Sequence, residues 1–171
     1  MAGRVPRADP SPSAWPRGWL DYEEYKIVHS RYIAILYDEG IIATDDLVFE
    51  EVYDELTGAI AQVGLSGNVI CCCGAEVRVS KWMETRPRRD GGFDVRTVYY
   101  QYHAWWPKVG KKRQQALVRY DHAHGSKPHR HQFDPAGRQV GHEELALEMM
   151  PRLDAVIREA AGFVATLVNS S

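Results

Sequence analysis

Four histidines lie within ten residues of this sequence, where they form the pairs His122/His124 and His129/His131. Imidazole exchanges protons near neutral pH and is a common metal ligand, so such a group can carry acid–base or metal chemistry. The members of each pair are two residues apart, a spacing that puts both side chains on one face of a β-strand. Residues 125–128, Gly-Ser-Lys-Pro, are typical of a turn. The pattern therefore predicts a β-hairpin that presents histidines from both of its strands.

The loop length decides which histidines meet across this hairpin. With residues 125–128 as the loop, His124 lies opposite His129, and His122 lies opposite His131. All four imidazoles then share one face, with directly opposed Cβ atoms about 4.5–5.5 Å apart. Repulsion between imidazolium ions would keep some of them neutral near pH 7. The alternative is a solvated polar hairpin in which the histidines have no common role.

The chemistry that suits such a patch best is cleavage of a phosphodiester without a metal. One imidazole would take the proton of the ribose 2′-hydroxyl, and another would protonate the leaving oxygen. A nearby cation would bind the non-bridging phosphate oxygens. The candidate catalytic residues are His122, His124, His129 and His131, and the candidate phosphate contacts are Arg119, Lys127 and Arg130.

Strand alternation counts against some of the candidate cations. It places Arg119, Asp121 and Arg130 on the face opposite the histidines. Twist and bulges near the end of a hairpin re-aim side chains, which weakens this objection. Lys127 lies in the turn and is free of the constraint.

The same imidazoles allow two other interpretations. Three or four of them on paired strands can reach one tetrahedral metal ion, and a hydrolytic metal site often adds a carboxylate. Asp121 and Asp134 face away from the imidazoles in the expected register, so no metal ligand and no cofactor are assigned. The third interpretation is a non-catalytic binding surface made of the histidines and the aromatic segment 99–106, although such aromatics are more typical of a core. The remaining histidines, His29, His103 and His142, are interpreted as isolated.

Composition narrows the class of protein. A chain of 171 residues suits one domain with one core. The net charge of −2 argues against a protein whose main task is to coat DNA or RNA. No apolar run approaches the roughly 20 residues of a membrane span, and residues 1–18 lack the apolar core of a signal peptide. The three cysteines are consecutive and form neither a disulfide framework nor a Cys-rich zinc site. We expect a cytoplasmic protein without a membrane partner, with a disordered lead-in at 1–18 and one domain at 19–171.

Hydrophobic periodicity predicts the elements that must position the hairpin. Helical stripes are expected over residues 20–37, over 45–63 and from Pro151 onward, with a further helical start at 143–150. Strand-like patterns cover residues 68–73, 75–86, 95–106, 115–124 and 129–134, with turns at 87–92, 107–113 and 134–137. These elements predict an α+β fold, an antiparallel β-meander sheet with two N-terminal helices and a C-terminal helix packed on it.

The central half of the chain resembles a known family. Arg119-Tyr120-Asp121, then His124-Gly125, then His129-Arg130-His131 is similar to the motif of TumE-type toxins of bacterial toxin–antitoxin systems and their uncharacterised relatives. The resemblance implies a compact α+β toxin, a helix-turn-helix antitoxin as partner, and RNA cleavage or other interference with translation. The positions that match are Arg119, Asp121, His124, His129 and His131.

The motif and the hairpin chemistry together predict a toxin-like, metal-independent endoribonuclease that acts on RNA. His124 and His129 are the expected acid–base pair, and His131 is a supporting imidazole. Arg119 or Arg130 is the expected phosphate contact, and Asp121 is a further candidate substrate-binding residue. The alternative is a non-catalytic protein whose histidine hairpin binds a partner or a structural metal.

Overall fold

The structure is a computed structural model that describes residues 18–107, 114–122, 127–146 and 149–169. Residues 1–17 of the expected N-terminal lead-in lie outside the described residues. His124 and the turn residues 125–126 lie outside them as well.

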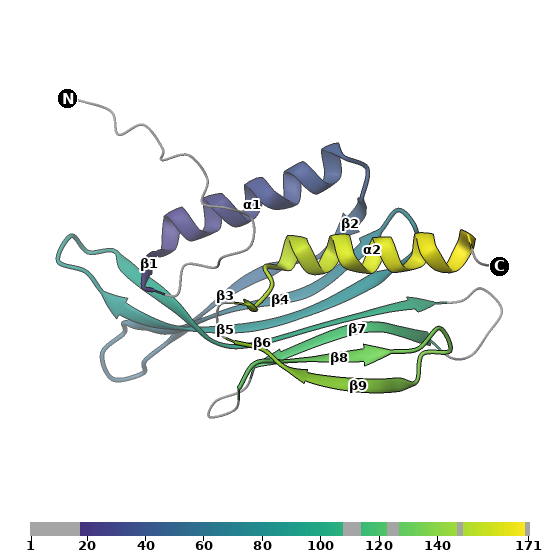
Figure 1. The fold of residues 1–171 in the computed structure, drawn as a ribbon. Helices are drawn as coiled ribbons and strands as arrows, with labels where there is room; N and C mark the ends of the chain where they lie inside the picture. Colours follow the sequence, from purple (N-terminus) through teal and green to yellow (C-terminus); the bar gives the residue numbers. More distant parts are fainter. Residues whose placement is uncertain (1–17, 108–113, 123–126, 147–148, 170–171) are drawn as a thin grey trace.

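A nine-stranded antiparallel sheet forms the body of the fold, with strand order β2-β4-β5-β6-β7-β8-β9. Strand β3 also pairs with β4, and β1 pairs with β6. Both long helices lie on the same side of the sheet (Figure 1). In chain order the elements are β1 (Leu20–Asp21), α1 (Tyr22–Asp38), β2 (Ile42–Asp45), β3 (Val48–Tyr53), β4 (Ile60–Cys71), β5 (Glu76–Pro87), β6 (Phe93–Pro107), β7 (Gln114–His122), β8 (His129–Phe133), β9 (Gln139–Glu144) and α2 (Leu153–Asn169).

The expected antiparallel α+β architecture is confirmed, as are the first and last helices. Helix α1 is capped by Asp21, whose carboxylate accepts a hydrogen bond from the Glu24 backbone N–H at 2.9 Å. Helix α2 begins at Leu153, two residues after the expected start at Pro151. Its predicted apolar stripe is buried against the sheet and includes Leu153, Val156, Ile157, Ala160 and Val164.

The expected second N-terminal helix is wrong, because residues 45–63 form β3 and the start of β4 instead. The segment is rich in β-branched and aromatic residues, which favour strands. At its centre the Asp54 side chain accepts hydrogen bonds from the backbone N–H groups of Leu56 and Thr57 at 3.0 and 2.8 Å. Gly58 follows with a φ of 67°, a left-handed conformation that glycine adopts without strain. These residues make a hairpin turn where the helical periodicity predicted continuous helix.

The described residues after the turn at 134–137 also differ from the expected helical start at 143–150. Gln139–Glu144 form the edge strand β9, which pairs with β8 and places Glu144 opposite His129, while residues 147–148 lie outside the described residues. Asp134 accepts hydrogen bonds from the N–H groups of Ala136 and Arg138, both at 2.9 Å, and closes the predicted turn. A tight turn of this kind returns the chain as a hairpin, which explains the extra strand.

The core lies between the sheet and the two helices. Tyr100 and Tyr102 from β6 are buried there with rings 5.0 Å apart, so these aromatics serve packing and not recognition. Lys81 from β5 is buried beside them, and its Nζ donates a hydrogen bond to the Tyr25 hydroxyl of α1 at 2.7 Å. Burial lowers the pKa of Lys81 well below its usual value.

His29 of α1 makes stability depend on pH. Burial, followed by the nearby charge of Lys81, lowers the pKa of His29 from 6.5 to about 4, while Asp45 and Asp154 oppose the shift. The unfolded chain therefore binds this proton at a higher pH than the folded chain, so folding stability is full above about pH 6.5 and falls as the pH drops toward 4. The contribution of this residue is at most about 3 kcal/mol.

We expect a His29→Gln variant to lose less stability than the parent chain between pH 7 and pH 4.5. Urea unfolding of both proteins at several pH values measures the difference directly. Parallel stability curves for the two proteins over this range would contradict the assignment.

No helix among the described residues is long and apolar enough to cross a membrane.

Candidate active site

The hairpin of β7 and β8 pairs in a different register from the expected one. His129 lies opposite Asp121, not His124, and His131 lies opposite Arg119, not His122. Each partner is three positions earlier in the chain than expected. Because side chains alternate with a period of two, an odd shift exchanges the two faces of one strand relative to the other.

The prediction that all four imidazoles share one patch is therefore wrong. His122 falls on the face that carries Tyr120, which is directed at the helices, and its ring lies 5.8 Å from that of Tyr100. Arg130 pairs with Tyr120 across the hairpin and shares this face. His129 and His131 lie on the opposite face of the sheet, and His124 is outside the described residues.

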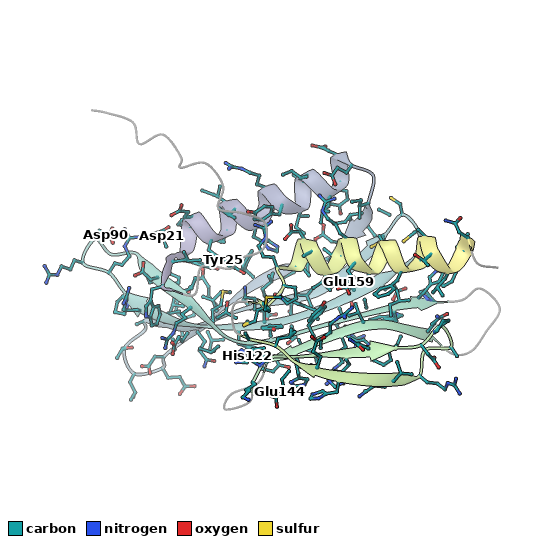
Figure 2. The ribbon with its side chains drawn as sticks, in the orientation of Figure 1. Asp21, Tyr25, Asp90, His122, Glu144 and Glu159 are labelled. Atoms are coloured by element: carbon teal, nitrogen blue, oxygen red, sulfur yellow. The ribbon has the colours of Figure 1, made fainter. Side chains whose placement is uncertain are left out.

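Glu159 of α2 contacts two side chains, Tyr120 and Arg130, on the face of the sheet that is directed at the helices. Its carboxylate accepts a hydrogen bond from the Tyr120 hydroxyl at 2.7 Å and forms an ion pair with Arg130. Figure 2 shows Glu159 between α2 and the sheet, whereas Glu144 lies on the far side of β8 and β9. Arg130 is thus engaged in joining the hairpin to α2, and its predicted role as a phosphate contact has no support from its position.

The far face gathers a different group, which we call the histidine–aspartate cluster. Arg119 and Asp121 contribute from β7, and His129 and His131 from β8. The edge strand β9 adds His142, which lies directly opposite His131. The ring centroids of the three histidines are 4.8–5.3 Å apart. Strand alternation thus places Arg119 and Asp121 with the imidazoles, not across the sheet from them as expected.

Asp121 is the centre of the cluster. Its Oδ2 atom lies 2.7 Å from Arg119 Nε, 3.0 Å from His131 Nε2 and 3.6 Å from His129 Nε2. Its Oδ1 atom accepts a hydrogen bond from Gln101 Nε2 on β6 at 2.8 Å. A carboxylate held from both oxygens is fixed in position and can orient the rings that it touches.

His129 has one nitrogen assigned by its surroundings. Its Nδ1 lies 3.1 Å from the carbonyl oxygen of Lys127, and a carbonyl oxygen can only accept a hydrogen bond. The proton of the neutral ring is therefore on Nδ1. Nε2, on the side of Asp121, carries the lone pair that a general base or a metal ligand needs.

One side of the cluster is buried in the protein, and the other side, its rim, is open to solvent. The side chains of Asp121 and His131 are 10% and 13% exposed, whereas that of Arg119 is 38% exposed and His142 is exposed. Burial, with a further contribution from Arg119, lowers the pKa of His131 and so favours its neutral form. At the rim, Lys127 forms an ion pair with Glu144 at 2.7 Å.

His103 on β6 extends the same face. It lies opposite Arg119, and burial lowers its pKa. Its Nε2 atom is buried and has no hydrogen-bond partner among the described residues. The sequence analysis interpreted His103 and His142 as isolated, and the structure shows that both lie beside the cluster residues.

One signal in the sequence pointed to His142. The turn at 134–137 is recognisable from its composition, and a return strand after it would place Gly141 to Glu144 beside the histidine strand. For His103 the sequence holds no such signal, because its approach to Arg119 depends on the pairing of β6 with β7.

The cluster can support proton transfer between imidazoles, anion binding at Arg119, or binding of a metal ion by nitrogen ligands. Comparison of the chain with models of known families, with curated proteins and with solved structures gives no match. Its function is therefore argued from the cluster.

Proposed function

We propose that this chain is a toxin-type endoribonuclease of the cytoplasm that cleaves RNA at the histidine–aspartate cluster without a metal. The observation that carries the proposal is that Arg119, Asp121 and three imidazoles share one face around the Asp121 carboxylate. A base, an acid and a phosphate-binding cation are the groups that cleavage at a ribose requires.

The reaction is a transfer of the phosphoryl group to the neighbouring 2′-oxygen. The 2′-oxygen forms a bond to phosphorus while the bond from phosphorus to the 5′-oxygen breaks. Nε2 of His129 accepts the 2′-hydroxyl proton, since its Nδ1 already donates to the Lys127 carbonyl. His142, whose ring centroid is 4.8 Å away at the exposed rim, gives a proton to the leaving 5′-oxygen. The products are a 2′,3′-cyclic phosphate and a 5′-hydroxyl.

Arg119 and His131 support this exchange in different ways. Arg119 contacts Asp121 through Nε, and its partly exposed guanidinium is placed to bind a non-bridging phosphate oxygen. His131 is packed against Asp121 and against both neighbouring rings, so it positions the proton-transferring pair. In this assignment His142 takes the place of His124 as the second member of the pair.

The resemblance to TumE-type toxins supports the same function and adds a partner. A helix-turn-helix antitoxin encoded beside this chain would bind it and suppress its activity. Expression of this chain alone is expected to stop growth, and co-expression of the neighbouring gene is expected to restore it. Unimpaired growth and intact total RNA in both cultures would contradict a toxin.

The cleavage itself is tested with the purified full chain, a single-stranded RNA of mixed sequence and DNA of the same sequence, all in EDTA. We expect shortened RNA with 2′,3′-cyclic phosphate ends, detected by mass spectrometry, and intact DNA, because DNA lacks the 2′-hydroxyl. The proposal fails if a panel of RNAs that includes total cellular RNA stays intact at stoichiometric protein.

A further inference from the structure

We propose that His129, His131 and His142 form a binding site for one zinc ion. One ring nitrogen from each of these residues lies within 4.8 Å of the other two. Zinc–nitrogen bonds of about 2.0–2.1 Å in a tetrahedral site put ligand atoms about 3.4 Å apart, so small rotations of the three rings bring them into range. Neutral imidazole is a ligand that zinc favours, and three of them meet here from two adjacent strands.

The surroundings already hold these rings as ligands are held in metal sites. The Nδ1–H group of His129 donates to the Lys127 carbonyl, which directs its Nε2 lone pair into the cluster. Ligating histidines commonly make such a bond with their second nitrogen, and it fixes the tautomer of the ring. His142 and His131 are opposite each other across paired strands, so the sheet sets their separation.

One carboxylate of the cluster is placed to interact with a bound cation. The Asp121 Oδ2 atom lies 3.0 Å from His131 Nε2 and 3.6 Å from His129 Nε2, so a carboxylate flanks two of the three ligands. Gln101 and Arg119 hold this carboxylate in place. The negative charge of Asp121 would then act on both Arg119 and the bound ion. His142 is exposed, so the ion enters from solvent and keeps a coordination position open to water.

Zinc binding has a consequence for the proposed reaction, and this part of the inference rests on the proposed function. A bound ion takes the lone pair that His129 needs as the base, and its bond to a His142 nitrogen displaces the proton that His142 needs as the acid. Zinc occupancy and metal-free cleavage therefore exclude each other, so we infer that zinc inhibits the enzyme.

Binding is tested without reference to activity. The full chain, freed of metal with a chelator, is dialysed against zinc and analysed by inductively coupled plasma mass spectrometry. We expect one zinc per chain, and we expect cobalt to replace it and give the intense visible absorption of a tetrahedral site. His142→Gln should lower zinc affinity at least tenfold, whereas the neighbouring Glu143→Gln, as the matched control, should retain it.

Activity then tests the inhibition separately. RNA cleavage that falls as zinc is added, in step with occupancy, supports the full inference. No zinc retained by the parent chain, or equal retention by His142→Gln and parent, overturns the site whether or not RNA is cut. Zinc that binds to the parent chain while RNA stays intact without zinc leaves the site standing and rejects the proposed function. Cleavage that rises with zinc overturns the inhibition.

Discussion

Replacing His129 by alanine is expected to slow RNA cleavage by about 10²- to 10⁴-fold, the usual contribution of a general acid or base. His129 is assigned as the base because its Nδ1 donates to the Lys127 carbonyl, which leaves the Nε2 lone pair beside Asp121. His129 lies on the face of the sheet opposite the helices, so its truncation leaves the core between the sheet and the helices intact. The loss should therefore be seen in the rate constant, with the free energy of unfolding nearly unchanged.

Variants of His142 test whether His129 acts together with this second histidine. If the two imidazoles act as one proton-transferring pair, the double variant His129→Ala/His142→Ala should be about as slow as either single variant, because residues that act as a unit are not additive. Glu143→Gln, adjacent to His142 on β9 but directed to the other face, is the matched control and should keep the parent rate. Single-turnover rates on a defined RNA in EDTA are measured for the parent chain and the four variants.

Two results would contradict the assignment. One is a His129→Ala variant that cleaves RNA at the parent rate. The other is a loss of cleavage that is matched by a large loss of folding stability, which urea unfolding of the same preparation would detect. The second result would make His129 a structural residue of the hairpin.

The largest effect on stability is expected at Ile157, for which substitution by alanine should cost about 2–5 kcal/mol. Ile157 is fully buried on α2, where that helix covers the sheet. Truncation removes buried apolar surface and leaves a cavity that surrounding side chains fill only in part. A typical domain has only about 5–15 kcal/mol of stability, so this one change removes a large share of it.

Val168→Ala is the matched control on the same helix. Val168 is 57% exposed, so its truncation should change stability by no more than about 0.5 kcal/mol. Urea unfolding at pH 7.5 gives both values, and the Ile157 variant should melt about 4–20 °C lower than the parent. Equal unfolding midpoints for the two variants would show that α2 does not pack on the sheet as described.

The local sequence pattern was sufficient to predict those helices and strands that keep one hydrophobic periodicity along their whole length. The stripe of α2 and the strands that became β5 and β6 were predictable because side-chain spacing is a local property of the backbone. The segment 45–63 was not, because its apolar residues fit a helical period while their β-branched and aromatic character favours strands. Pairing along β4 decided between the two.

The sequence by itself determined that histidines, an aspartate and an arginine meet at one hairpin, since they lie close together on the chain. Only the tertiary structure decided which of them share a face. Tyr120 must turn toward Glu159 and the helices, so its neighbours Arg119 and Asp121 turn outward. The hairpin register, which depends on the loop length and on this packing, then brings His129 and His131 to Asp121 and places His122 across the sheet. His142 joins through a second hairpin, because contacts between strands depend on pairing and not on distance along the chain.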